Sequence, residues 1–446
     1  MNPAFARIAG ASAIMVSIAV FFCFSQAAEK KVDFTGYSSY SFGQIVQGSY
    51  ESTDGTTNID HYWSHEVYTG LGFHAAINER FTIKAAVEGK MWQPYPSNAG
   101  VRDFQKRNYS LWLDQGNASY SAGDPEKPWL TMTMGYFKYK YNPEARNLGE
   151  QLFRSVAYPG FVTNYFDFPA TRLLGYQAHV ELMEGNLKAD ALIISESDWY
   201  PFGDFSPALV ASYKPHKAVE IGGGVEFVRL ISVNSRKTTP IVDEHSLYPN
   251  YIIDSVVKDQ FGNSTTYYDS SSYYTFKATK LMGRITLDPK AIFDISFFGP
   301  EDGKLYGEVD VIGLKNYSYW YNDLSNRIPI MVGFNFPAFK LLDVLSLEFE
   351  HYGYPFSTSF ENVWRLACPV SKDGDFPGDW SPQKYKFDDW KWSVYAKKTV
   401  FPGFSITLQV ARDHMHTIYS DGRENYSESL LRPGQWWWTA KLSYSL

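Results

Sequence analysis

Apolar and polar residues alternate one by one through most of the chain, in segments that end at a turn or a polar loop. The last segment, residues 436–446, runs to the carboxyl end with Trp438 and Leu442 on one face and Thr439 and Lys441 on the other. A period of two is the period of a β-strand. A soluble protein seldom leaves so apolar a final strand as an uncovered sheet edge, whereas in a closed barrel the last strand pairs with the first. The pattern therefore predicts strands closed into a barrel.

The alternating segments predict about 16 strands, an even number. Residues 288–303 are the ambiguous stretch, because Pro289, Pro300 and the acidic pair Glu301 and Asp302 crowd a potential strand there. We predict a structured turn, since one more strand would make the number odd and exchange the loop sides midway. An even number puts both termini and all short turns on one side, and the long loops on the other. The predicted strands are about 32–46, 61–77, 80–92, 107–121, 129–141, 172–183, 187–196, 207–214, 218–231, 273–287, 304–318, 328–336, 344–355, 389–400, 403–416 and 435–446.

Alternation within the strands also predicts which side chains point into the barrel. Glu220 and Glu226 alternate with apolar neighbours in one strand, and Glu348 and Glu350 do so in another. A lysine or arginine on the lipid face would cost roughly 2–4 kcal/mol near the bilayer midplane, so charged residues belong on the inner face. A barrel of about 16 strands is too wide for side chains alone to fill. The predicted fold is all-β, a single transmembrane antiparallel barrel that conducts or carries a plug.

The amino-terminal segment has the features of an export signal. Arg7 precedes an apolar stretch at about 8–24, which is followed by a small-x-small cleavage site ending at Ala27. We expect residues 1–27 to be removed as a signal peptide, which leaves 28–446 as the barrel. A retained anchor helix is the alternative, but the apolar stretch is shorter than the roughly 20 residues that a membrane span needs.

Composition agrees with a membrane barrel and argues against one class of partner. Hydrophobic residues make up 44% of the chain and the mean hydropathy is −0.31; membrane barrels share such averages, because only every second strand residue meets lipid. Aromatic residues reach 17%, and Tyr and Trp are favoured at membrane–water interfaces. The net charge of −7 argues against a nucleic-acid partner. After removal of the signal, Cys368 is the only cysteine, so no intrachain disulfide is expected.

The apolar alternation that ends at Leu446 resembles the C-terminal signal of Gram-negative outer-membrane β-barrels. In that family the last residue is usually Phe, and here it is Leu. The resemblance implies an outer-membrane location and recognition of the last strand by the barrel-assembly machinery. Outer-membrane lipid and lipopolysaccharide are then expected partners, and a homo-oligomer is left open.

The segment at 142–169 is the most distinctive loop. It contains Arg146, Glu150 and Arg154, followed by an aromatic stretch with Tyr158, Phe161, Tyr165, Phe166 and Phe168. So apolar a loop should fold against a surface rather than stand in water. We predict that it folds into the barrel lumen and narrows the pore. Arg146 and Arg154 would then either lie near the solute path or anchor the loop to the wall.

The strands on either side of this loop carry a second resemblance. Gly135, Phe137 and Lys138 precede the loop, and Arg172 and Gly175 follow it. This arrangement resembles porins of the phosphate-selective O and P type, over about 50 residues. The resemblance implies a porin. The lysine-rich pattern of a dedicated anion path is not visible, so phosphate is not implied by the residues themselves.

Several charged residues are candidates for the pore wall. Lys84, Glu88 and Lys90 share one strand face, where they form either a structural salt-bridge ladder or part of the conduction path. Glu348 and Glu350 either attract cations or pair with lysines such as Lys391 or Lys397. The candidate pore-lining and constriction residues are Lys84, Glu88, Lys90, Lys138, Arg146, Arg154, Arg172, Glu348 and Glu350.

Motifs for catalysis and cofactor binding were not found in the sequence. There is no GxSxG, HExxH, Walker loop or dinucleotide fingerprint. His414 and His416 would share one strand face, a weak pattern for zinc or copper that more often has no such role. We therefore expect no enzyme activity, no cofactor and no metal.

Three functions are compatible with these features. The first is a porin for passive diffusion of small hydrophilic solutes, with the 142–169 loop as the constriction. The second is a surface adhesin or carbohydrate-binding barrel, which would use the aromatic-rich loops at about 232–272 and 357–388. The third, a soluble secreted β-sandwich or propeller, has no internal repeat or disulfide framework in its favour.

Overall fold

The computed structural model describes residues 31–52, 55–93, 108–153, 171–196, 203–233, 251–258, 260, 262, 264–273, 278–293, 297–314, 324–351, 390–412, 415–418, 424–429 and 434–446. The expected signal peptide, residues 1–27, lies outside this set and stays a prediction. So do the roles expected of Arg154 and of the loop at 357–388. In the described part of the chain, no helix has the length and apolar character needed to cross a membrane.

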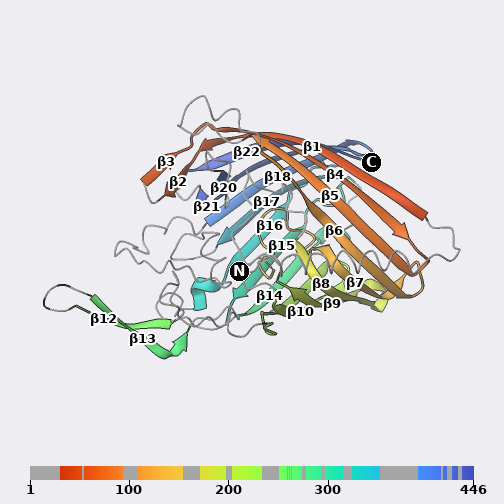
Figure 1. The fold of residues 1–446 in the computed structure, drawn as a ribbon. Coiled ribbons are helices and arrows are strands. Elements are labelled where there is room, and N and C mark those ends of the chain that lie inside the picture. Colours follow the sequence, from red (N-terminus) through yellow and green to blue (C-terminus); the bar gives the residue numbers. More distant parts are fainter. Residues whose placement is uncertain are drawn as a thin grey trace.

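Sixteen antiparallel strands form a closed barrel (Figure 1). The first strand pairs with the last as well as with its neighbour in sequence, so the sheet has no free end. In chain order the strands are β1 (Lys31–Gln47), β4 (Trp63–Ala76), β5 (Phe81–Gln93), β6 (Asn108–Gly123), β7 (Pro128–Tyr139), β8 (Thr171–Leu182), β9 (Leu187–Ser195), β10 (Phe205–His216), β11 (Val219–Val228), β14 (Ala278–Leu287), β15 (Leu305–Ile312), β16 (Ile330–Asn335), β17 (Val344–His351), β18 (Trp390–Phe401), β19 (Phe404–Arg412) and β22 (Trp436–Ser445). Each predicted strand overlaps one of these, and the predicted barrel is confirmed.

The turn predicted at 288–303 is also confirmed in its described residues. It opens with the short 3-10 helix η3 (Pro289–Ala291) and joins β14 to β15 without adding a strand. The even number of strands therefore holds, and the short turns and both ends of the barrel chain lie on one side. The carboxyl end is fixed there by a hydrogen bond from the Leu446 N–H to the Gly36 carbonyl, 2.8 Å long.

Three loop regions contain strands that lie outside the barrel. One set forms a four-stranded sheet outside the barrel, and the other forms a separate hairpin within the segment expected to be a loop at 232–272 (Figure 1). Most of these strands are polar, and the strand at 251–258 (YIIDSVVK) has its apolar residues in adjacent pairs rather than in alternation, so the pattern used for the barrel gives no signal there. The strands are β2 (Ser49–Ser52), β3 (Gly55–Asn58), β20 (Met415–Ile418) and β21 (Glu424–Ser429) in the sheet, and β12 (Tyr251–Lys258) and β13 (Ser264–Tyr273) in the hairpin.

The two faces of the barrel wall differ as the alternation predicts. On β17, Glu348 and Glu350 are buried on the inner side, whereas Phe349 between them is 44% exposed. Glu220 and Glu226 on β11 likewise face inward, where they pair with Arg284 and Lys280 of β14. The outer face carries exposed apolar residues around the barrel, among them Leu71, Val87, Leu113, Met132, Tyr176, Ile193, Leu209, Ile221, Ile285, Val309, Val332, Phe349, Leu408 and Leu442. An apolar outside and a polar inside are the features of a membrane barrel.

Candidate functional site

The chain after β7 turns into the barrel rather than outward. The backbone N–H groups of Arg146, Asn147 and Leu148 donate hydrogen bonds of 2.6, 2.9 and 3.0 Å to the carboxylate of Glu348 on β17. The Tyr306 hydroxyl on β15 donates to the same carboxylate, at 2.9 Å. Glu348 faces the lumen and is fully buried. One carboxylate of the inner wall therefore holds a whole turn of the loop.

Two more inner-wall carboxylates hold the next residues of the loop. Glu350 accepts hydrogen bonds from the Gly149 N–H at 3.1 Å and from the Gln151 side-chain amide at 3.2 Å. Glu308 on β15 accepts from the Asn142 side-chain amide at 2.6 Å and from the Gln151 N–H at 3.2 Å. Burial of a carboxylate is costly unless donors replace its water, and charge-assisted bonds of this kind are the stronger class. These contacts fix the loop to the far wall.

The loop is also closed on itself. The N–H groups of Tyr141 and Asn142 donate to Glu150 at 3.1 and 2.7 Å, and the Leu152 N–H donates to the Tyr141 hydroxyl at 3.1 Å. Burial raises the pKa of that hydroxyl well above its ordinary value. It therefore keeps its proton, which it donates to Glu308 at 2.7 Å. The loop is built as a compact unit whose hydroxyl and amide groups are already directed at the wall.

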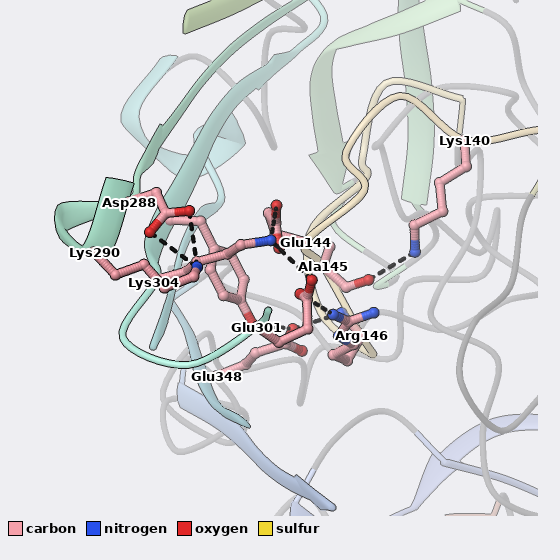
Figure 2. A network of polar contacts seen from close by, with 10 residues as sticks. Lys140, Glu144, Ala145, Arg146, Asp288, Lys290, Glu301, Lys304 and Glu348 are labelled. Carbon is pink, nitrogen blue, oxygen red and sulfur yellow. Dashed lines mark hydrogen bonds and ion pairs between the residues drawn. The ribbon is translucent and has the colours of Figure 1, made fainter. Parts of the chain in front are cut away.

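An ionic cluster fastens the loop to the turn between β14 and β15 (Figure 2). Arg146 contacts Glu301 at 2.9 Å, and Lys304 lies between Glu144 at 3.1 Å and Glu301 at 2.9 Å. Burial raises the pKa of Glu144 despite the nearby Lys304. Burial alone would also raise the pKa of Glu301, but Lys304 and Arg146 hold it below its ordinary value. The cluster is called the clasp below, and it consists of Glu144, Arg146, Glu301 and Lys304.

Apolar contacts complete the seat of the loop. Leu152 is fully buried among inward-facing residues of five barrel strands, and Leu148 packs with Ala145, Tyr306 and Met331. The prediction that the loop at 142–169 folds against the lumen is confirmed for its described part, residues 142–153. Together with Lys140 and Tyr141, which join it to β7, this part is called the loop at 140–153 below. The residues around Leu152 are Phe137, Tyr139, Tyr141, Leu173, Leu192, Ala208, Val210 and Met282.

A second cluster of charges lies on the wall formed by β5, β6, β7 and β8. Glu88 is 2% exposed and accepts hydrogen bonds from Trp112 at 3.1 Å and Arg172 at 2.8 Å. Asp114 contacts Lys138 at 2.7 Å and Arg172 at 2.7 Å. The Tyr37 hydroxyl also donates to Glu88, and so does that of Tyr68, at 3.2 Å. Of the candidate residues, this cluster joins Glu88, Lys138 and Arg172, which the sequence had not grouped.

The remaining candidates are more scattered. Lys90 pairs with Glu66 on β4 at 3.3 Å, and both side chains are buried. Lys84 is on the same face of β5 but its side chain is exposed. Lys391 lies directly opposite Glu350 in the register of β17 and β18. None of these contacts tests conduction, so the pore-lining roles stay predictions.

Sequence reasoning missed three acidic residues: Glu308 in the wall that holds the loop, Asp114 in the second cluster and Glu301 in the clasp. Glu308 alternates with Val309 and could have been found as an inward carboxylate of β15. Asp114 could not, because the register between β5 and β6 shifts beside it and the alternation breaks there. Glu301 lies in an irregular turn, where no period exists. Its partner Arg146 is far away in the sequence and becomes its neighbour only through the fold.

A different part of the inner wall carries hydroxyl groups. Ser119 and Thr133 on β6 and β7 lie 3.0 Å apart, and Ser121 and Thr131 lie 3.4 Å apart. In the described residues, no group of three or more His, Cys, Asp or Glu side chains is placed to hold a metal ion. Of the histidine pair, His414 lies outside these residues. Further hydroxyl and amide residues of the inner face are Ser39, Ser41, Thr407, Gln409 and Thr439.

The chain was compared with known proteins. No family model and no curated protein matches it. An engineered mutant of the Rh. blastica porin aligns with a TM-score of 0.42 and 7% identity, over 93% of this chain and 100% of that chain. Another mutant, named as a Rhodopseudomonas blastica porin, gives 0.39 and 6% over the same shares. Likeness this low carries no weight, and the fold rests on the closed strand pairing. The fold is a closed antiparallel β-barrel of 16 strands.

Proposed function

We propose that the protein is an outer-membrane porin that lets small hydrophilic solutes diffuse passively through its lumen. The observation that carries the proposal is the loop at 140–153, which is bonded to the inner wall of a closed sixteen-strand barrel. Side chains cannot fill so wide a barrel. A loop fixed across part of the lumen would leave a narrower path, which is how a barrel of this size acquires a size limit. A Gram-negative outer membrane and a cleaved signal peptide belong to this proposal.

The nature of the inner wall supports hydrophilic solutes. Most backbone carbonyls and amides of the wall are paired within the sheet, so the solute would meet side chains, among them the hydroxyl groups of Ser119 and Thr133 and charged pairs such as Lys138 with Asp114. Many of the charges are balanced in pairs, such as Lys90 with Glu66. Paired charges produce weak net fields, so the proposal expects weak ion selectivity rather than a specific anion or cation path.

Conductance in a planar lipid bilayer tests the proposal. The folded protein, purified in detergent, should insert and give discrete single-channel steps that scale with salt concentration. The same preparation after heat unfolding is the control. A folded barrel that inserts but never conducts, and that does not release small sugars from liposomes, would overturn it.

A surface-binding barrel is the second candidate, and one observation favours it. The long-loop regions hold ordered strands of their own, the β12–β13 hairpin and the sheet of β2, β3, β20 and β21. Such structure is more than a simple pore requires. Retention on insoluble polysaccharide, lost when residues 251–273 are deleted while conductance persists, would support this function over the first.

A further inference from the structure

The pairing between β6 and β7 ends halfway up the barrel wall. β6 pairs with β5 from Tyr120 to its first residue, Asn108. Its pairing with β7 begins at Gly123 and stops where Gly116 lies opposite Tyr136. In the described residues, the upper half of β6 therefore has no ladder on the β7 side. The end of the β7–β8 pair leaves the wall at this height.

Two glycines lie opposite each other where the ladder stops. Gly135 on β7 and Gly175 on β8 are register partners, with φ angles of +117° and +155°. A Cβ atom on Gly135 would overlap the carbonyl oxygen of Gly116, and one on Gly175 would overlap that of Ile193. Only glycine fits backbone of this kind. The pair therefore permits a bend that any side chain would prevent.

Beyond the glycines the strand ends turn into the lumen. Phe137 and Leu173 are buried against Leu192 and Met282, which belong to the inner face of other strands. The rings of Tyr139 and Phe153 lie 5.3 Å apart, so the strand end is in contact with the loop that it leads into. The bent end of β7 and β8 is the base on which the loop stands.

Lys138 and Arg172 alternate with these buried residues and so point the other way, across the gap toward β5 and β6. Arg172 reaches Glu88 at 2.8 Å and Asp114 at 2.7 Å, and Lys138 reaches the same two carboxylates at 3.6 and 2.7 Å. Two cations from the bent strands thus meet two carboxylates from the straight ones. Ion pairs take the place of the missing backbone ladder.

We propose that Gly135 and Gly175 form a hinge, and that Lys138 and Arg172 clamp it, so that together they set the position of the loop at 140–153 in the lumen. The inference rests on the proposed porin function, because the loop's position matters as the limit on pore width. Lys138 and Arg172 are positioning residues and need not touch the solute. The residues that carry the resemblance to the O and P porins, with Phe137 as the buried base, are these same positions.

The test compares neutral variants of the clamp with a matched control. Arg172→Gln and Lys138→Gln each leave a carboxylate with one cation fewer. Arg80→Gln removes an exposed cation from the turn between β4 and β5, which lies outside both the clamp and the candidate pore-lining residues. We expect the clamp variants to show higher single-channel conductance with a wider spread of levels, and Arg80→Gln to keep the parental level. Arg172→Lys, which keeps the charge, should restore most of the parental behaviour.

A distance measurement separates this inference from the proposed function. Spin labels at positions 84 and 140, in a chain carrying Cys368→Ser, report how far the loop base lies from the β5 wall. We expect one narrow distance in the parent and a broader, longer one in Arg172→Gln. An unchanged distance and conductance in folded Arg172→Gln would overturn the inference. A parent that never conducts, but whose label distance still broadens in Arg172→Gln, would overturn the porin and leave the clamp standing.

Discussion

The carboxylate wall of the lumen and its hydroxyl wall follow the same strand alternation but have different uses. On β15 and β17, Glu308, Glu348 and Glu350 are bonded to the loop through its N–H, amide and hydroxyl groups. On β6 and β7, Ser119 and Thr133 bond to each other within the wall. The acidic side chains therefore hold the loop in place, whereas the hydroxyl side chains of β6 and β7 remain part of the wall itself. An inward carboxylate in a barrel is thus no sign of cation transport until its donors are known.

The largest expected effect comes from breaking the carboxylate wall at its centre. Glu348→Ala leaves three loop N–H groups and the Tyr306 hydroxyl without their acceptor. Buried donors left unpaired cost about 1–3 kcal/mol each, and water entering the lumen offsets part of this, so loop docking should weaken by roughly 3–5 kcal/mol. Single-channel recording should show a larger, noisier pore.

Thr439→Ala on β22 is the matched control, since Thr439 is as buried as Glu348, whereas the carboxylates that hold the described part of the loop lie on β15 and β17. It should leave the conductance near the parental value. If Glu348→Ala and Thr439→Ala changed the single-channel conductance equally, the proposed difference between the two walls would be wrong.

Adjacent residues of β7 test the two faces of the hydroxyl wall. Met132 is 47% exposed on the outer side, and Thr133 faces inward. Met132→Lys should destabilise the folded barrel by about 2–4 kcal/mol near the membrane midplane. Thr133→Lys should fold normally and shift the reversal potential toward anions. Urea unfolding in lipid vesicles measures the first and a salt-gradient recording the second; identical unfolding curves would contradict the face assignment.

A smaller effect is expected at the clasp, which joins the loop to a turn rather than to the wall. Glu301→Gln removes the carboxylate that binds Arg146 and Lys304. These side chains are partly exposed, so solvent screening limits the loss to about 0.5–1 kcal/mol. Spin-label distances between the loop and the turn should broaden slightly, and Lys290→Gln, a neighbour that pairs with Asp288 instead, should not change them.

The smallest predicted effect is a pH dependence of the clasp. Burial raises the pKa of Glu144, so its contribution is complete below about pH 4.5 and is lost as the pH rises through its raised pKa. The pKa of Glu301 is lowered by Lys304 and Arg146, so its contribution is present above about pH 4.5 and is lost as the pH falls further. Docking of the loop against the turn should therefore be strongest near pH 4.5 and weaken on both sides. The spin-label distance between the loop and the turn can be measured from about pH 3 to pH 8. A distance that changes in only one direction over this range would contradict the opposite pH dependences assigned to Glu144 and Glu301.

The barrel could be predicted from sequence because its rule is local. Alternation gave strand positions and faces, and the need for an even number settled residues 288–303 as a turn. The bend at Gly135 and the shifted register beside Asp114 follow no such period. The partners of the loop could not be predicted either, because Asn147 and Glu348 are far apart in the chain and nothing local relates them. The aromatic content of the loop predicted that it would pack against a surface. Only the fold identifies that surface as the inner wall formed by β15 and β17.

The bond between Leu446 and Gly36 has a consequence for how the protein is made. In every other neighbouring pair, the two strands follow one another in the order of the barrel strands along the chain, so each hairpin can form as soon as its second strand is available. The pairing of β1 with β22 cannot form in this way, because the two strands are separated by the whole of the remaining barrel in the chain. Contacts of such long sequence separation form slowly. A chain that lacks β22 would be an open sheet whose edge strands β1 and β19 are unpaired on one side, so closure of the barrel depends on this strand.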